Sequence, residues 1–226
     1  FSKSLKVIEK LKPENIAAIC LESITAKNGG FVLPQPWITG MKKLQRHNQI
    51  KIIFDETVCG FYRTGKAFGF QHYDITPDVV CMGKAISNGM APLGAVYFNK
   101  KIIRKYRNTP FMSGLTNYAH PLSLAAFNGV SKYINSAIFQ KRMISNESIV
   151  DKWIRKVRPI VKDIRGRGFL FAIELKRDIP PNYFESNGIN ISTNHNMIIL
   201  CPVISMSSAN LKKDLKLLMH SIEGLV

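Results

Sequence analysis

The sequence has no long hydrophobic run, no N-terminal secretory pattern and no closely spaced cysteines. A membrane-spanning helix needs about 20 consecutive apolar residues, and no stretch approaches that length. The four cysteines, at positions 20, 59, 81 and 201, form no CxxC pair and no ligand cluster. We therefore predict no membrane partner, no metal site, and free thiols in a reducing intracellular compartment, either the cytoplasm or the mitochondrial matrix.

Acidic residues are also scarce, because 15 Asp and Glu stand against 32 Lys and Arg, which gives a net charge of +17. Such a balance can attract nucleic acid or other acidic partners. The densest basic cluster is NKKIIRKYRN, at residues 99–108, and no zinc-finger spacing or RNA-binding motif accompanies it. Nucleic acid therefore stays open as a partner without support from a motif. Much of the excess is lysine scattered among isoleucine and asparagine, which is typical of compositional bias.

Strands and helices are predicted to alternate along the first part of the chain. Short apolar runs predict buried strands at 16–21, 50–54, 79–82 and 94–98, and apolar spacing or an N-terminal proline predicts helices at 36–48 and 121–134. This alternation is typical of an α/β fold with a parallel sheet. Further along, strands are expected at FLFAIEL and MIILCP, and a closing helix at 210–222.

An acid and a lysine each follow one of these buried strands. Asp55 comes directly after the run 50–54, and Lys84 follows the run 79–82 by two residues. Ligands of parallel sheets bind at the carboxyl ends of the strands, so both side chains can face one small molecule. Pyridoxal phosphate chemistry needs such a pair, an acid for the pyridinium nitrogen and a lysine that forms an imine. Either residue alone is more often a solvated loop residue or a helix cap.

The sequence around these two residues contains several short motifs in a fixed order. Residues 54–98, FDETVCGFYRTGKAFGFQHYDITPDVVCMGKAISNGMAPLGAVYF, combine DE, GFxRTG, TPD, GK and PLGAV. This pattern resembles the core of the class III aminotransferases, which are fold-type I enzymes that depend on pyridoxal phosphate and include those of the ω-amino-acid type. The segments ENIAAICLESITAKNGGFVLP, SGLTNYAHPLSLAA and KDIRGRGFLFAIEL, at 14–34, 113–126 and 162–175, extend the resemblance.

The resemblance implies an α/β fold that corresponds to the C-terminal half of such an enzyme. Residues 1–139 are expected to form the C-terminal part of the cofactor-binding large domain, with an incomplete parallel sheet and a linker helix, and 140–226 a small α+β domain. The implied function is a pyridoxal-phosphate-dependent aminotransferase, which moves an amino group from an amine or ω-amino acid to a 2-oxo acid. The implied partners are a second copy of the chain or a complementary N-terminal chain.

The resemblance also assigns roles to residues of the expected cofactor site. Lys84 is expected to be the lysine that forms the Schiff base and moves the substrate proton. Asp55 is expected to keep the pyridine nitrogen protonated, and Val58 to pack near the ring. Thr116 is similar to a residue that reaches the cofactor phosphate of a neighbouring subunit, which implies a dimer.

Two further residues have a weaker assignment to the substrate. Glu22 is similar to a family glutamate near the substrate, and its alternative role is a strand-end carboxylate that pairs with an arginine. Arg165, in DIRGRG, either contacts the substrate or bridges the two lobes. Many family members carry an arginine for an α-carboxylate where this chain has Ile199, which argues against α-carboxylate binding by that route.

A second interpretation makes the chain an inactive, aminotransferase-derived structural subunit of a larger and possibly RNA-containing assembly. The high positive charge and the missing N-terminal half favour it, because half a sheet leaves a strand edge that a partner must cover. A third interpretation is one half of a split aminotransferase, which reconciles the lysine at position 84 with the absent phosphate loop.

Overall fold

The computed structural model describes residues 2–47, 49–110 and 112–226, which divide into two compact units. The first unit comprises the chain up to Ser23 together with Leu33–Phe61 and Phe68–Tyr133, and the second comprises Ile24–Val32, Tyr62–Ala67 and Ile134–Val226. The second unit thus includes two short segments that a sequence boundary after residue 139 assigns to the large domain. The domain boundaries at 1–139 and 140–226 stay a prediction.

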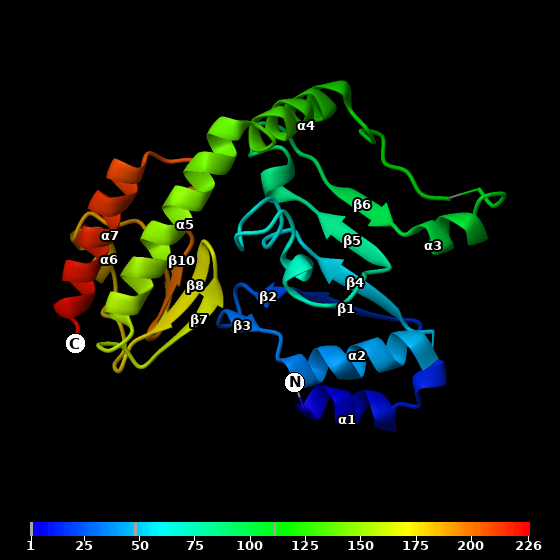
Figure 1. Cartoon of the computed structure of the whole chain (residues 1–226), viewed down its shortest axis with the longest axis horizontal. Coiled ribbons are helices and arrows are strands. Elements are labelled where there is room, and N and C mark those ends of the chain that lie inside the picture. Colours follow the sequence, from blue (N-terminus) through cyan, green and yellow to red (C-terminus); the bar gives the residue numbers. More distant parts are fainter. Residues whose placement is uncertain (1, 48, 111) are drawn as a thin grey trace. The chain divides into compact units, whose positions relative to one another are not determined.

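The first unit is built on a four-stranded sheet with the strand order β1-β4-β5-β6. Strands β1, β4 and β5 run parallel, and β6 pairs antiparallel with β5 (Figure 1). The strands are β1 (Ala18–Glu22), β4 (Lys51–Asp55), β5 (Val79–Met82) and β6 (Ala95–Phe98). The helices are α1 (Ser2–Lys10), α2 (Gln35–His47), α3 (Lys100–Lys105) and α4 (Pro121–Ile134), with 3₁₀ turns at Pro13–Asn15, Gly69–His72 and Lys84–Ile86.

Alternation along β4 decides which face of this sheet is covered. Ile52 and Phe54 are fully buried and pack in one cluster with Trp37, Ile38 and Met41 of α2. Helices α1 and α2 lie together along this side of the sheet (Figure 1). Because successive strand residues point to opposite faces, the last residue of β4, Asp55, shares the other face with Ile53 and projects from the carboxyl end of the strand.

A buried aspartate before β5 fixes the opposite end of the sheet. Asp78 accepts hydrogen bonds from the backbone N–H of Ile52 at 2.9 Å and from the Nδ2 of Asn99 at 2.8 Å. Asn99 in turn caps α3 by accepting from the N–H of Ile102 at 3.0 Å. Buried carboxylates persist only when such donors satisfy them. Asp78 therefore holds the starts of β5 and α3 against β4.

The second unit contains an antiparallel sheet with the order β7-β8-β10-β9, packed against two long helices (Figure 1). Its strands are β7 (Asp163–Arg167), β8 (Leu170–Glu174), β9 (Ser192–Asn194) and β10 (Met197–Leu200), and β2 (Ile24–Thr25) and β3 (Phe31–Val32) form a separate hairpin. Its helices are α5 (Ala137–Val157), α6 (Tyr183–Ser186) and α7 (Ser208–Glu223).

Helical spacing of apolar residues builds the core of this unit. Leu211, Leu215, Leu218 and Ile222 of α7 recur every three or four residues and are buried in the same cluster as Trp153 of α5. The indole N–H of Trp153 donates to the carbonyl of Leu215 at 2.7 Å, so the two helices are joined by a buried hydrogen bond as well as by apolar contact. Within the described ranges, no helix combines the length and the apolar character that a membrane crossing needs.

Candidate active site

The carboxyl ends of the parallel strands bring the predicted acid and lysine to one edge of the sheet. Glu22, Asp55 and Cys81 lie side by side in register on β1, β4 and β5. Residues that pair directly across neighbouring strands share a face, so Glu22 and Asp55 project from the same side. Lys84 follows Cys81 by three residues and begins the 3₁₀ turn after β5.

Asp55 is held by its own turn. Its Oδ1 accepts a hydrogen bond from the backbone N–H of Thr57 at 2.9 Å, and the residue is half-buried. One carboxylate oxygen is therefore fixed by the protein backbone, which orients the carboxylate plane. A carboxylate fixed at a strand end can pair with a cationic ring nitrogen.

The backbone at Lys84 adopts a conformation that L-residues rarely take. Its φ is +45°, in the left-handed region, and the side chain is exposed. The preceding Gly83 has no side chain, and a Cβ there would lie 3.1 Å from the Cγ2 of Thr57. The chain before Lys84 thus passes close to the turn after Asp55. Strained backbone of this kind concentrates at functional sites, where the surrounding structure enforces it.

The loop after Lys84 is tied down by two serine hydroxyls. Buried Ser87 donates to the carbonyl of Ala91 at 2.6 Å, and Ser123 of α4 donates to the carbonyl of Pro92 at 2.8 Å. These bonds fix the segment that carries the PLGAV motif as it enters β6.

The other residues predicted to contact the cofactor or the substrate in the first unit divide into two groups. Val58 and Glu22 are half-buried and lie beside Asp55, the first in the turns after β4 and the second at the end of β1. Thr116 lies on the exposed segment between α3 and α4. The structure therefore brings four predicted residues to one sheet edge, and the roles of all of them stay predictions.

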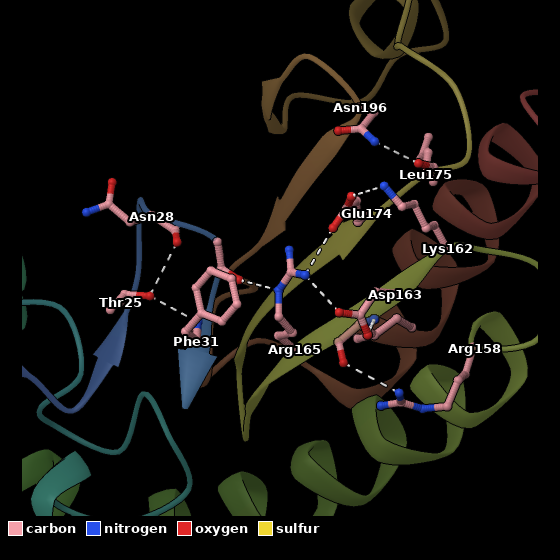
Figure 2. Close-up of polar contacts among 12 residues, drawn as sticks. Thr25, Asn28, Phe31, Arg158, Lys162, Asp163, Arg165, Glu174, Leu175 and Asn196 are labelled. Carbon is pink, nitrogen blue, oxygen red and sulfur yellow. Dashed lines mark hydrogen bonds and ion pairs between the residues drawn. The ribbon is translucent and has the colours of Figure 1, made fainter. Parts of the chain in front are cut away.

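Arg165, on β7, is at the centre of a polar cluster in the second unit (Figure 2). Its Nε donates to the carbonyl of Gly29 at 2.7 Å, and its Nη1 donates to Asp163 at 2.7 Å and to Glu174 at 3.0 Å. Its guanidinium also lies over the ring of Phe31, at 4.6 Å from the ring centroid. Arg165 thus holds the β2–β3 hairpin against β7, and its contact with a substrate stays a prediction.

The pKa of Glu174 is lowered by this cluster. The largest cause is the hydrogen bond from Lys162, which also forms an ion pair at 2.7 Å, and the second is the bond from Arg165. Gly30 of the hairpin makes the close approach to the sheet possible, since a Cβ there would lie 2.8 Å from the Cβ of Ala172.

One buried carboxylate at the site was missed by the sequence analysis. Glu56, the second acid of the DE motif, is fully buried and accepts hydrogen bonds from the N–H of Gly69 at 2.7 Å and of Phe70 at 2.8 Å. Burial raises the pKa of Glu56, and a hydrogen bond from the Ser23 hydroxyl opposes that effect. The only signal in the sequence was the acid pair itself, and it does not show which residues donate hydrogen bonds to Glu56.

Among residues 2–47, 49–110 and 112–226, no group of three or more His, Cys, Asp or Glu side chains is placed to hold a metal ion. The polar groups at the sheet edge are instead a carboxylate at the end of β4 and an amine after β5. Together they suit a ligand with a basic ring nitrogen and a carbonyl carbon that an amine can attack.

Comparisons with known proteins identify the family. A family model, Aminotransferase class-III, matches residues 1–222. The adenosylmethionine-8-amino-7-oxononanoate aminotransferase of Buchnera aphidicola subsp. Schizaphis graminum is 31% identical, over 97% of this chain and 53% of its own length. The taurine–pyruvate aminotransferase of Bilophila wadsworthia is 27% identical, over 76% of this chain and 40% of its own length. The chain spans about half the length of the curated relatives it matches.

A solved structure supports the same fold. The taurine:2-oxoglutarate aminotransferase from Bifidobacterium kashiwanohense, in complex with PLP and glutamate, superposes with a TM-score of 0.90 at 24% identity, over 99% of this chain and 55% of that one. This likeness confirms the predicted fold class, the C-terminal part of a fold-type I transferase. The names of these relatives offer nothing for the interpretation as a structural subunit. By its family match and its fold, the chain belongs to the class III aminotransferases.

Proposed function

We propose that this chain supplies the lysine and the ring-binding acid of an aminotransferase, which moves an amino group from an amine or ω-amino acid to a 2-oxo acid. Enzymes of this family use pyridoxal 5′-phosphate. The observation that carries the proposal is the register of Asp55 with Cys81, which sets Lys84 just beyond the neighbouring strand end. The printed names of the two taurine aminotransferases support an ω-amino compound as the donor.

The residues at the sheet edge fit this cofactor. Asp55 presents a carboxylate whose Oδ1 is oriented by the N–H of Thr57. Lys84 carries an exposed amine on a turn with strained backbone, and the lack of a side chain at Gly83 lets this turn pass close to Thr57. A bound pyridoxal phosphate supplies an electron sink for the substrate carbanion. With the cofactor bound, Asp55 would hold a proton on the ring nitrogen by charge pairing, and the Nζ of Lys84 would accept the proton from the substrate Cα and pass it on to the cofactor.

We assign supporting roles to the other predicted residues. Val58 contributes apolar contact beside Asp55, and Glu22, level with Asp55 on β1, faces the substrate. Arg165 acts through the β2–β3 hairpin, because its Nε and Nη1 are already bonded within the second unit. Ile199 of β10 leaves no guanidinium for an α-carboxylate at its position, which suits a donor recognised by another group.

We also propose that a second copy of the chain covers the segment that carries Thr116. The large apolar side chains of Met112, Leu115 and Tyr118 are 93%, 82% and 79% exposed. A run of this kind marks a surface that another chain covers. Thr116, between them, then reaches the cofactor phosphate of the second copy. A monomeric mass in light scattering counts against the homodimer, and association only with a complementary N-terminal chain supports the split enzyme.

Trapping of the cofactor tests the proposed function. The chain, in its native assembly, is incubated with pyridoxal phosphate, reduced with borohydride and mapped by mass spectrometry. We expect a pyridoxyl group confined to Lys84, and loss of both the adduct and amino transfer in Lys84→Ala. The matched control is Lys66→Ala, in the same sequence region, which keeps the adduct at Lys84. No adduct, or modification scattered over many lysines, contradicts the proposal.

A further inference from the structure

A carboxylate that cannot reach a substrate joins three segments next to the candidate site. Glu56 and Ser23 are both 0% exposed. One carboxylate oxygen of Glu56 accepts from the Ser23 hydroxyl, at the end of β1, and from the N–H of Phe70, and the other accepts from the N–H of Gly69. A single side chain therefore links the ends of β1 and β4 to the 3₁₀ turn Gly69–His72.

The fit around this carboxylate is tight. A Cβ on Gly69 would lie 2.6 Å from the Cβ of Ser23 and 3.1 Å from that of Cys59, so only glycine brings its N–H within reach. The Tyr73 hydroxyl extends the network, because it donates to the carbonyl of Ser23 at 2.7 Å and accepts from the N–H of Leu33 at 3.2 Å. The turn is thus fastened to β1 through both the side chain and the carbonyl of Ser23.

The backbone of Glu56 is fixed as firmly as its side chain. Its N–H donates to the carbonyl of Cys81 on β5 at 2.9 Å, and its carbonyl accepts from the N–H of Gly60 at 2.9 Å. Asp55 directly precedes it, and Thr57, whose N–H orients the Asp55 carboxylate, directly follows it. Any displacement of Glu56 therefore changes the geometry between Asp55 and Thr57.

We propose that Glu56 is a positioning residue that sets the orientation of the Asp55 carboxylate and the position of Asp55 along the sheet edge relative to Glu22. Burial of a carboxylate is costly unless charge-assisted hydrogen bonds compensate it, and three donors do so here. The clamp holds Ser23, which follows Glu22, and the turn that follows Asp55. The inference rests on the proposed function, since it concerns the residue that binds the ring nitrogen, although its test does not require the cofactor.

The test is the variant Glu56→Gln, examined by amide-resolved hydrogen exchange on the whole chain without cofactor. Glutamine keeps the shape of the side chain but replaces one acceptor oxygen by a donor. We expect exchange of the Thr57 amide to become about tenfold faster, together with that of Gly69 and Phe70, which corresponds to the loss of a bond to a charged group. The control Asp74→Asn changes an exposed carboxylate in the same unit and leaves Thr57 within about twofold of the parent chain.

A second variant covers the case in which Glu56→Gln does not fold. Ser23→Ala keeps the carboxylate and removes one donor, and we expect the Thr57 amide to exchange roughly threefold faster. If either folded variant exposes the Gly69 or Phe70 amide while Thr57 stays protected, Glu56 only anchors the turn and the inference is wrong. Trapping at Lys84 in the parent chain is independent of this result. A failed proposed function therefore appears as a missing adduct, and a failed positioning role appears as an unchanged Thr57 amide.

Discussion

Replacement of Asp78 by alanine offers the sharpest test of how the first unit is held together. The Asp78 side chain is buried, and its Oδ2 accepts from the N–H of Ile52 at 2.9 Å and from the Nε2 of Gln45 at 2.8 Å. Its Oδ1 accepts from the Nδ2 of Asn99 at 2.8 Å. The carboxylate therefore connects β4, α2 and the start of α3 at the amino end of β5, opposite the candidate site.

The three bonds differ in what their loss costs. Ile52 is 0% exposed, so its N–H finds no water in Asp78→Ala and loses about 1–3 kcal/mol. Gln45 and Asn99 are half-buried and keep their other hydrogen bonds, to the Thr76 carbonyl and the N–H of Ile102, so each loses roughly 0.5–1 kcal/mol. Removal of the buried charge offsets part of this sum. We expect the free energy of unfolding of the first unit to fall by about 2–4 kcal/mol.

The two tryptophans make the measurement selective. Trp37 belongs to the first unit and Trp153 to the second, so in a Trp153→Phe background urea unfolding followed by fluorescence reports the first unit. The control is Asp74→Ala, which removes a 91% exposed carboxylate whose ion pair with Lys42 is screened by solvent and adds little stability. If Asp78→Ala loses no more stability than this control, with an unchanged denaturant slope, the account of the buried aspartate is refuted.

Two further predictions concern the second unit. Leu218→Ala empties a buried position of α7 and should cost about 2–5 kcal/mol, measured by urea unfolding followed by Trp153 fluorescence in a Trp37→Phe background. The neighbouring Leu217 is 43% exposed, so Leu217→Ala should cost under about 1 kcal/mol, and equal losses contradict the packing of α7. The pKa of Glu174 is lower in the folded state than its unfolded value of 4.5, so this carboxylate stabilises the fold at pH values above 4.5. That stabilisation should be lost as the pH falls through the folded pKa. Glu174→Gln should flatten this acid dependence while Leu217→Ala keeps it, and an unchanged slope in Glu174→Gln counts against the cluster.

The strands of the first unit were predictable because their apolar runs are short, β-branched and bounded by turn residues. The predicted strand at 79–82 and helix at 121–134 have the bounds that the structure gives to β5 and α4. The direction of β6 was not predictable in the same way. β6 was expected within a parallel sheet, but it runs antiparallel to β5. The sequence does not show this direction, because a side-chain pattern of period two is the same in either direction.

The elements that were missed are those whose pattern is diluted by polar residues. No element was assigned to 137–157, although α5 spans Ala137–Val157, because its buried Met143, Val150 and Val157 alternate with many charged and polar residues. The N-cap Ser136, which accepts from the N–H of Phe139 at 3.2 Å, was the available signal. β7 has the sequence DIRGR, which lacks the apolar alternation of a strand and forms through pairing with β8.

The placement of candidate site residues could be predicted only where each residue follows an element that is recognisable in its own segment. Asp55 and Lys84 each follow a recognisable strand, so their meeting at one sheet edge follows from topology. The environment of Glu56 depends on Ser23 and Gly69, which are 33 and 13 residues away, and no local pattern connects them. The same reasoning applies to Arg165, whose bond partner Gly29 is 136 residues away.

Close backbone packing explains why the GRG and RTG motifs contain no residue that we propose for the cofactor. Gly168 has a φ of +60°, and a Cβ there would lie 2.4 Å from the carbonyl carbon of Thr64, so the GRG and RTG motifs meet where no side chain fits. Arg63 closes this contact by donating to the carbonyl of Pro202 at 2.6 Å, and its own carbonyl accepts from the N–H of Phe169 at 2.9 Å. Residues 62–67 follow the turn after Asp55 in the chain, yet they belong to the second unit. The spacing of the GRG and RTG motifs is therefore set by where the backbone must pass, and neither motif contains the acid or the lysine that we propose for the cofactor.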